Sequence, residues 1–200
     1  SVPRRAAQVL LERYRACLRE CDLVAISGRI IRGLPADFFC RLIELARRAG
    51  KVSAVDTSGV PLKNVMARSG PNLIKMNRSE FEEATGKPFS QPELSRVFGR
   101  MKKRGTQYML VTDGPFATYA ITPQNSWKFH PPDIEVVTPV GAGDSFMAGL
   151  ICGYAHGLSR QDCARLALGC AASDCLSLGA GIINKRQCQF YARKAHLQKL

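Results

Sequence analysis

The sequence is short of negative charge. It holds 16 Asp and Glu residues against 29 Lys and Arg residues, which gives a formal net charge of +13. Such a balance favours polyanionic partners: nucleic acids, anionic lipids or phosphorylated small molecules. The densest basic run, Arg100–Arg104, falls where a helix is predicted to end and where the helix dipole favours cations. Zinc-finger, KH and RNP patterns are lacking, so we favour a solvated basic face and keep nucleic-acid binding as a minor hypothesis.

Long apolar runs are also lacking. No stretch approaches the roughly 18 apolar residues of a membrane-spanning helix, so an integral membrane protein is not expected. The first ten residues give way at once to charged Glu12 and Arg13, unlike a signal peptide. Because the chain opens with Ser1, we expect a processed product, an expressed segment or a part of a longer protein.

The eight cysteines include no C-x-x-C pair, and the three histidines are not spaced with them as zinc ligands. Most cysteines sit among apolar residues, as Cys170 does in the run 168–172. Free cysteine packs like a small hydrophobe, so we expect buried, reduced thiols and a cytoplasmic location.

A length of 200 residues, with 46% hydrophobic and 22% charged residues, predicts one globular domain over residues 1–200. Short apolar runs alternate with helical patterns, and they predict βαβ units with helices on both faces of a parallel sheet. The predicted strands are 23–26, 52–55, 73–76, 108–111 and 134–137, with a hairpin at 116–121 and 126–129. The predicted helices include 4–20, 36–49, 90–104, 145–156, 160–176 and 185–196, with the chain helical from 145 to its end.

Polar and glycine-rich segments follow the predicted strands. They are Ser27-Gly28, Asp56–Gly59, Asn77–Glu80, Thr112–Gly114 and Gly141–Asp144. Ligands of parallel α/β sheets bind outside the carboxyl ends of the strands, so we expect these five segments to converge on one rim.

The segment Val140–Gly149 carries the clearest chemical signal. Its two glycines, Gly141 and Gly143, allow a tight turn that exposes successive N–H groups where a helix begins. Asp144 is then placed to accept a proton from a hydroxyl group while the N–H groups stabilise a phosphoryl group. The alternative is that Asp144 only caps the helix. No Lys-Ser/Thr pair follows, so this is not a Walker A sequence.

Val-Gly-Ala-Gly-Asp-Ser-Phe-x-Ala-Gly resembles the C-terminal signature of the ribokinase-like (PfkB) carbohydrate kinases. Other motifs agree in order and spacing: Ser27-Gly28 with Gly33-Leu34-Pro35, Asp56–Gly59, and Lys75–Glu80. Together they resemble the branch of 1-phosphofructokinase and tagatose-6-phosphate kinase. The resemblance implies an α/β protein with a three-layer α/β/α, mostly parallel sheet. It covers the C-terminal two thirds of the family fold, so the lid and the N-terminal strands are missing.

The resemblance implies ATP-dependent transfer of a phosphoryl group to the hydroxymethyl group of a sugar phosphate, of the fructose 1-phosphate or tagatose 6-phosphate type. Asp144 would be the general base, and the backbone of Gly141, Ala142 and Gly143 would form the anion hole. The family's motif begins with an Asp, where this chain has Thr138. The monovalent-cation site of some relatives would therefore lack an expected ligand here.

The resemblance also implies ATP and Mg²⁺ as cofactors. Asn77 and Glu80 would place Mg²⁺, largely through water; the alternative is a turn Asn and a first-turn Glu. The implied nucleotide-binding residues are Thr112, Gly114, Ala171, Ala172, Cys175, Gly179, Gly181 and Asn184, although the small residues among them could equally serve close helix packing. The implied substrate-binding residues are Ser27, Gly28, Arg29 and Lys75, where Arg29 could instead be a solvated substitution.

The implied partners are therefore a sugar phosphate and ATP, with neither nucleic acid nor membrane, and with a homo-oligomer left open. The alternative function is a catalytically incomplete relative that binds nucleotide and serves as a binding or assembly subunit. The residues that hold the sugar in the family lie upstream of the region matched here, and this favours the alternative.

Overall fold

A computed structural model describes residues 3–200, with only the backbone of Arg4. The chain divides into two compact units, residues 1–111 and residues 112–200, which are described one at a time. The strands follow one another in the sheet in chain order, from β1 to β7. Strands and helices alternate over most of the chain, so the prediction of an α/β fold is confirmed.

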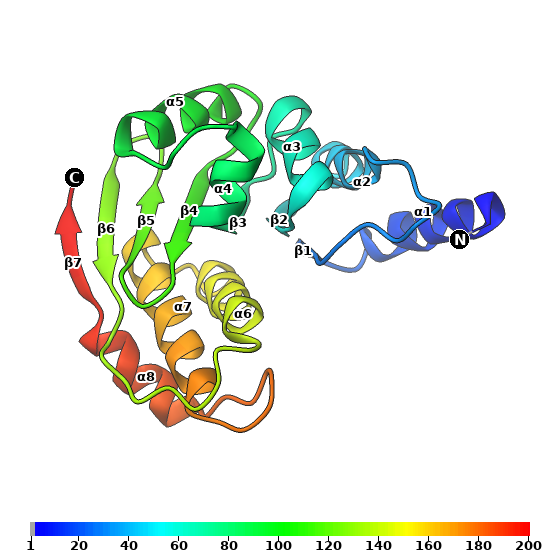
Figure 1. Cartoon of the computed structure of the whole chain (residues 1–200). Coiled ribbons are helices and arrows are strands. Elements are labelled where there is room, and N and C mark those ends of the chain that lie inside the picture. The colour runs from blue at the N-terminus through cyan, green and yellow to red at the C-terminus, as the bar shows by residue number, and fades with distance from the viewer. Residues whose placement is uncertain (1–2) are drawn as a thin grey trace. The chain divides into compact units, whose positions relative to one another are not determined.

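The first unit is built from βα repeats (Figure 1). Its elements are α1 (Arg4–Cys17), β1 (Leu23–Ser27), α2 (Phe38–Arg48), β2 (Val52–Asp56), α3 (Gly59–Arg68), β3 (Leu73–Asn77), α4 (Arg78–Thr85), α5 (Gln91–Lys102) and most of β4 (Tyr108–Asp113). Strands β1, β2 and β3 are parallel, with Ser27 opposite Asp56 and Asp56 opposite Lys75. Their carboxyl ends therefore lie side by side, as the sequence predicts for this part of the chain.

The core of the first unit explains why its strands are continuous apolar runs. Ala54 and Val55 of β2, and Leu73, Ile74 and Met76 of β3, have no exposed surface. Strands that are buried on both faces need apolar side chains at successive positions rather than at alternate ones. Helix α2 adds a buried stripe at helical spacing that includes Phe38, Leu42 and Ala46.

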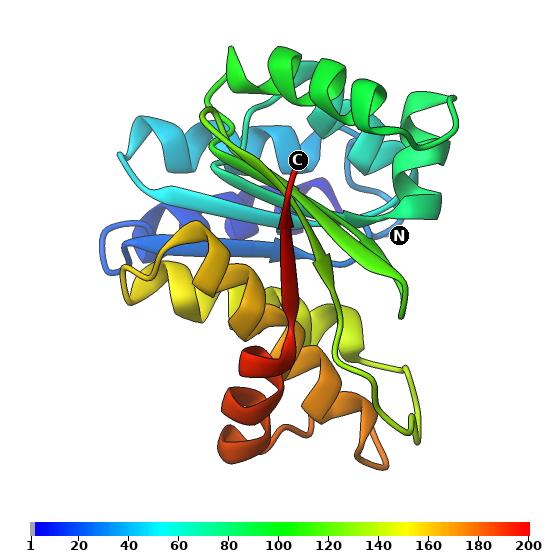
Figure 2. The same cartoon turned by 90° about the vertical axis from the view of Figure 1, so that its left-hand side faces the viewer.

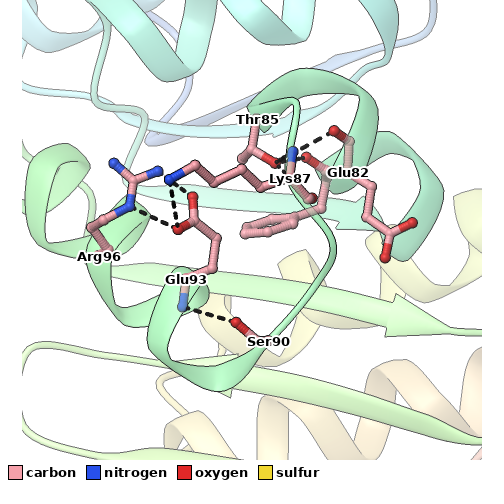
Figure 3. Close-up of polar contacts among 7 residues, drawn as sticks. Glu82, Thr85, Lys87, Ser90, Glu93 and Arg96 are labelled. Atoms are coloured by element: carbon pink, nitrogen blue, oxygen red, sulfur yellow. Dashed lines mark hydrogen bonds and ion pairs between the residues drawn. The ribbon is translucent and has the colours of Figure 1, made fainter.

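The junction between α4 and α5 is fixed by polar contacts (Figure 3). Glu82 accepts a hydrogen bond from the Phe89 N–H at 2.9 Å, and this bond, with the Arg78 guanidinium, lowers the pKa of the Glu82 carboxyl group. Ser90 caps α5 by accepting from the Glu93 N–H, while Glu93 pairs with Arg96. These contacts set the direction in which the chain leaves α4.

The second unit joins an antiparallel ribbon to a group of three helices. Its elements are β5 (Ala117–Ile121), β6 (Ser126–His130), α6 (Ala142–Ala155), α7 (Arg160–Cys175), α8 (Lys185–Lys194) and β7 (His196–Lys199). β6 pairs antiparallel with β5 and with β7, the red C-terminal strand in Figure 2. The sheet is thus parallel at β1–β3 and antiparallel at β5–β7.

Glycines let the three helices approach closely. A Cβ atom added to Gly149 of α6 would lie 2.9 Å from the Ala167 Cα of α7, and one added to Gly169 of α7 would lie 2.1 Å from the Cys188 carbonyl oxygen of α8. Figure 1 shows α6, α7 and α8 packed beside one another. Gly149 and Gly169 therefore serve close helix packing.

Two predictions about secondary structure are wrong. Residues 134–137 are not a strand, because the Val137 N–H donates to the Cys175 carbonyl oxygen at 2.8 Å rather than to a neighbouring strand. The chain is not helical to its end: α8 stops at Lys194, and β7 follows on the edge of β6. In residues 3–200, no helix is long and apolar enough to cross a membrane.

The cysteines differ sharply in exposure, which gives a first testable prediction. Cys17 and Cys152 are exposed, whereas Cys163, Cys170 and Cys188 are buried. Burial, reinforced by the neighbouring Cys188, raises the pKa of the Cys170 thiol to about 12. The thiolate is the nucleophile. Iodoacetamide at pH 8 is therefore expected to label Cys17 and Cys152 rapidly, and to label Cys170 at a rate lower by a factor of about 10³ or more. Peptide mass mapping over time checks this, and equal labelling would contradict the packing of α7 against α8.

Candidate active site

The turn before α6 has the geometry of an anion-binding site. Gly141 caps the helix with φ +94°, a left-handed conformation that glycine adopts without strain, and no side chain caps the end. The Ala142 N–H donates to the Pro139 carbonyl oxygen at 3.3 Å. Among the described residues, the N–H groups of Gly141, Gly143 and Asp144 have no acceptor, so they are the three donors that an anion can use.

Asp144 lies in the first turn of α6 and is exposed. Within residues 3–200 its carboxylate has no hydrogen bond or ion pair, and it accepts no capping bond. The alternative that Asp144 merely caps the helix is therefore not supported by any contact. A free carboxylate beside three free N–H groups can accept a proton while those groups hold an anion.

The last turn of α7 holds the neighbouring segments in place. The Cys175 carbonyl oxygen accepts from the N–H groups of Val137 and Thr138, at 2.8 and 3.2 Å. Ser173 Oγ accepts from the Asn184 N–H at 2.9 Å, and Asp174 Oδ1 accepts from the Ile182 N–H at 2.9 Å. One helical turn thus fastens both the segment that leads into Gly141 and the loop that follows α7.

The predicted nucleotide-binding residues all lie in the second unit, in four settings. Thr112 is half-buried in β4, and Gly114 lies in the exposed turn that follows, at φ +50°. Ala172 is buried in α7, while Ala171 and Cys175 are half-buried. Gly179 and Gly181 lie in the exposed loop after α7, at φ +108° and +74°. Asn184 caps α8 by accepting from the Arg186 and Gln187 N–H groups.

The predicted substrate-binding residues lie in the first unit. Ser27 ends β1, and the Gly28 N–H donates to the Asp56 carbonyl oxygen at 3.1 Å. The Gly28 carbonyl oxygen accepts from Thr57 Oγ1 at 2.7 Å. Arg29 is exposed, and among the described residues it has no partner.

Lys75 is the most buried cation of this group. Its ammonium group lies 2.9 Å from Asp56 Oδ2, and the two side chains are only 7% and 12% exposed. Both residues sit at the carboxyl ends of neighbouring strands, so the sheet register brings them together. The pair places a buried ammonium group, neutralised by the Asp56 carboxylate, at the end of β3.

Asn77 and Glu80 form a reciprocal capping box at the start of α4. Asn77 Oδ1 accepts from the Glu80 N–H at 2.8 Å, and Glu80 Oε2 accepts from the Asn77 N–H at 2.7 Å. Glu80 keeps Oε1 without a partner among the described residues. Over residues 3–200, no three His, Cys, Asp or Glu side chains are grouped for a metal. One carboxylate and one amide carbonyl fit Mg²⁺, which retains several waters and binds few protein oxygens.

The capping box supports a prediction about stability. Asn77→Ala removes one capping bond and is expected to lower the free energy of unfolding by about 0.5–2 kcal/mol, as N-cap truncations generally do. Urea unfolding in EDTA measures this, with Ser90→Ala at the start of α5 as a matched cap. An unchanged stability in Asn77→Ala would contradict the capping box. A Mg²⁺ role would appear separately, as a raised Mg²⁺ requirement in Glu80→Gln and not in Ser90→Ala.

Comparison with known proteins identifies the family. The profile of the pfkB family carbohydrate kinases matches residues 5–186, and the chain belongs to this family. A possible 1-phosphofructokinase from Thermotoga maritima superposes with a TM-score of 0.88 at 18% identity, over 100% of this chain and 64% of that one. Phosphofructokinase-2 from Escherichia coli superposes with a TM-score of 0.85 at 20% identity, over 96% and 63%. A candidate phosphofructokinase from Staphylococcus aureus gives 0.85 at 22%, over 100% and 64%. The chain therefore spans less than two thirds of the length of these structures, which share its fold.

Sequence reasoning missed Asp174. This residue is fully buried in α7 and lies against Gly141, although the two are 33 positions apart in the chain. The only signal was an acidic residue within the apolar run 168–176, where an unpaired charge is costly.

Proposed function

We propose that the protein transfers the γ-phosphoryl group of ATP to a hydroxymethyl group of a sugar phosphate, of the fructose 1-phosphate or tagatose 6-phosphate type. The observation that carries this proposal is the free carboxylate of Asp144 beside the free N–H groups of Gly143 and Asp144 at the start of α6. Phosphoryl transfer needs little covalent chemistry from the protein. It needs a base for the acceptor hydroxyl group and donors for the charge that the transferred group carries.

In this proposal Asp144 accepts the proton of the attacking hydroxyl group, and the Gly141, Gly143 and Asp144 N–H groups hold the transferred phosphoryl group. The Ala142 N–H contributes less than predicted, because it already donates to Pro139. Asn77 and Glu80 would hold Mg²⁺ through their side-chain oxygens and water. When bound, Mg²⁺ neutralises phosphate charge and orients the phosphates.

The surface around the loop after α7 supports the placement of the nucleotide base. Val140, Leu178, Ile182 and Ile183 are each 46–84% exposed, so apolar side chains are exposed on both segments. The segments that carry them are adjacent, because a Cβ atom on Gly141 would lie 2.7 Å from the Ala180 Cβ. An exposed apolar strip beside glycine turns suits the flat face of adenine.

We propose that Ser27, Gly28, Arg29 and Lys75 bind the sugar phosphate, and that the buried Lys75 ammonium group makes the main contact with its phosphate. We also propose that residues 1–200 act as a single domain in this reaction, within the cytoplasm. One related structure is the tetrameric inhibited form of Escherichia coli phosphofructokinase-2. We leave homo-oligomerisation of this chain as a property to measure by light scattering.

The test is a coupled assay for ADP with Mg²⁺, ATP and a panel of fructose 1-phosphate, fructose 6-phosphate and tagatose 6-phosphate. We expect saturable turnover that requires one of these sugars. No turnover with any of them, under conditions where the protein binds ATP, would contradict the kinase proposal. That outcome would favour the second candidate, a nucleotide-binding relative that acts as a binding or assembly subunit.

A further inference from the structure

Asp174 is a buried acidic residue in which only one of the two carboxylate oxygens has a hydrogen-bond partner among the described residues. It has no exposed surface in the last turn of α7. Its Oδ1 atom accepts from the Ile182 N–H, whereas Oδ2 is buried and has no hydrogen-bond partner among the described residues. A buried carboxylate oxygen without a donor is costly, so it needs another source of stabilisation.

The orphaned oxygen faces the start of α6. A Cβ atom added to Gly141 would lie 2.7 Å from Asp174 Oδ2, so the carboxylate lies directly against the N-cap of that helix. The N-terminus of a helix carries about half a positive charge, and it stabilises a nearby carboxylate without a hydrogen bond. The helix has 14 residues, so its dipole is well developed. The N-terminus of α6 is therefore the electrostatic partner that Oδ2 otherwise lacks.

The same N-terminus is the one that exposes the free N–H groups of Gly143 and Asp144. Any anion bound there must share the positive end of α6 with the Asp174 carboxylate. We propose that Asp174 is a positioning residue that tunes this anion-binding turn: Oδ1 holds the loop after α7 against Gly141, and the charge on Oδ2 limits the affinity of the turn for phosphate. Only the identity of the anion, a phosphoryl group, rests on the proposed function.

A moderated affinity has a use in group transfer. An anion held equally well before, during and after transfer gains nothing in rate, because only stronger binding in the transition state accelerates the step. A fixed negative charge behind the turn weakens the hold on phosphate in the ground state and in the transition state alike. The Asp174 charge therefore sets how readily phosphate is bound and released and does not itself accelerate the transfer step.

The first test measures phosphate affinity directly at the turn. The ¹⁵N-labelled 200-residue chain is titrated with inorganic phosphate, and the Kd is taken from the amide shifts of Gly143 and Asp144. Asp174→Asn is nearly isosteric and removes the charge, so we expect its Kd to be lower by about threefold or more, as for a unit charge acting at short range. Asp162→Asn makes the same change in net charge at the start of α7 and is expected to leave the Kd unchanged.

An equal or higher Kd in Asp174→Asn would overturn the proposal, as would the absence of any phosphate-dependent shift in both proteins. A lower Kd in Asp162→Asn as well would assign the effect to net charge and would also overturn it. The readout needs no turnover. A lower Kd in Asp174→Asn together with an inactive kinase would support this inference while the proposed function failed.

The second test follows the loop. Asp174→Asn keeps an oxygen acceptor for the Ile182 N–H, whereas Asp174→Ala does not. We expect the exchange protection of the Ile182 amide to survive in the Asn variant and to be lost in the Ala variant. Ser173→Ala, which removes a neighbouring buried acceptor for Asn184, serves as the matched control and should leave Ile182 protected. Protection of Ile182 in Asp174→Ala would overturn the fastening role. The Ala variant also lacks the charge, and it repeats the phosphate test if the Asn variant does not fold.

Discussion

Asp144→Asn is expected to lower kcat for sugar-phosphate phosphorylation by about 10²–10⁴-fold, the range that a positioned general base contributes. The reason is that an amide cannot accept the proton of the attacking hydroxyl group. The backbone N–H groups of Gly143 and Asp144 do not depend on the side chain, so the affinity for ATP with Mg²⁺ should stay nearly unchanged. Steady-state kinetics and calorimetry on the same preparation separate the two quantities.

Asp162→Asn is the matched control for that experiment. Asp162 is the third residue of α7, as Asp144 is the third residue of α6, but its carboxylate is held by Ser159 and Arg165. The control should change stability slightly and leave kcat at the unmodified value. A kcat in Asp144→Asn within threefold of that control would remove Asp144 from the role of base.

Lys75→Met is expected to lower the free energy of unfolding by about 3–5 kcal/mol, the usual effect of removing one partner from a buried ion pair. The Lys75 and Asp56 side chains are 7% and 12% exposed, so water cannot replace the ammonium group efficiently. The double variant Lys75→Met with Asp56→Leu should recover much of that loss, because no buried charge is then left behind. Urea unfolding followed by circular dichroism measures all three proteins.

Lys51→Met provides the comparison. Lys51 lies 3.7 Å from Asp22, whose side chain is fully exposed, and surface pairs of this kind contribute at most about 1 kcal/mol. If Lys75→Met were no more destabilising than Lys51→Met, the Lys75–Asp56 pair would not be the buried contact described here. In that case, a loss of sugar-phosphate affinity in Lys75→Met could not be explained by the buried Lys75–Asp56 pair.

The positions of β1 to β6 along the chain and the glycine turn before α6 could be predicted from the sequence because local patterns determine them, although α6 begins at Ala142 rather than at the predicted residue 145. Buried parallel strands need continuous apolar runs, such as Leu73–Met76, and these are visible without any contact information. The pair Gly141 and Gly143 marks a turn that only glycine adopts easily. Ser90 followed by Glu93 is a typical pattern for the start of a helix, and Ser90 caps α5 in the structure.

Contacts between distant segments could not be predicted in this way. β7 forms because residues 196–199 pair antiparallel with the edge of β6. Nothing within those four residues specifies a strand. The role proposed for Asp174 depends on its contacts with Gly141 and Ile182, which meet it only in the folded chain. The reciprocal bonds of Asn77 and Glu80 were foreseeable from their spacing as a helix start, and they coexist with the proposed Mg²⁺ role.

The most direct measurement of the central claim compares ATP with ADP at the start of α6. In the ¹⁵N-labelled chain with Mg²⁺, addition of ATP is expected to shift the amide resonances of Gly143 and Asp144 strongly, because the γ-phosphate accepts their hydrogen bonds. ADP should shift them much less, while both nucleotides move the amides of the loop after α7 alike. Unchanged Gly143 and Asp144 resonances at saturating ATP would show that the phosphoryl group binds elsewhere, and the proposed mechanism would be wrong.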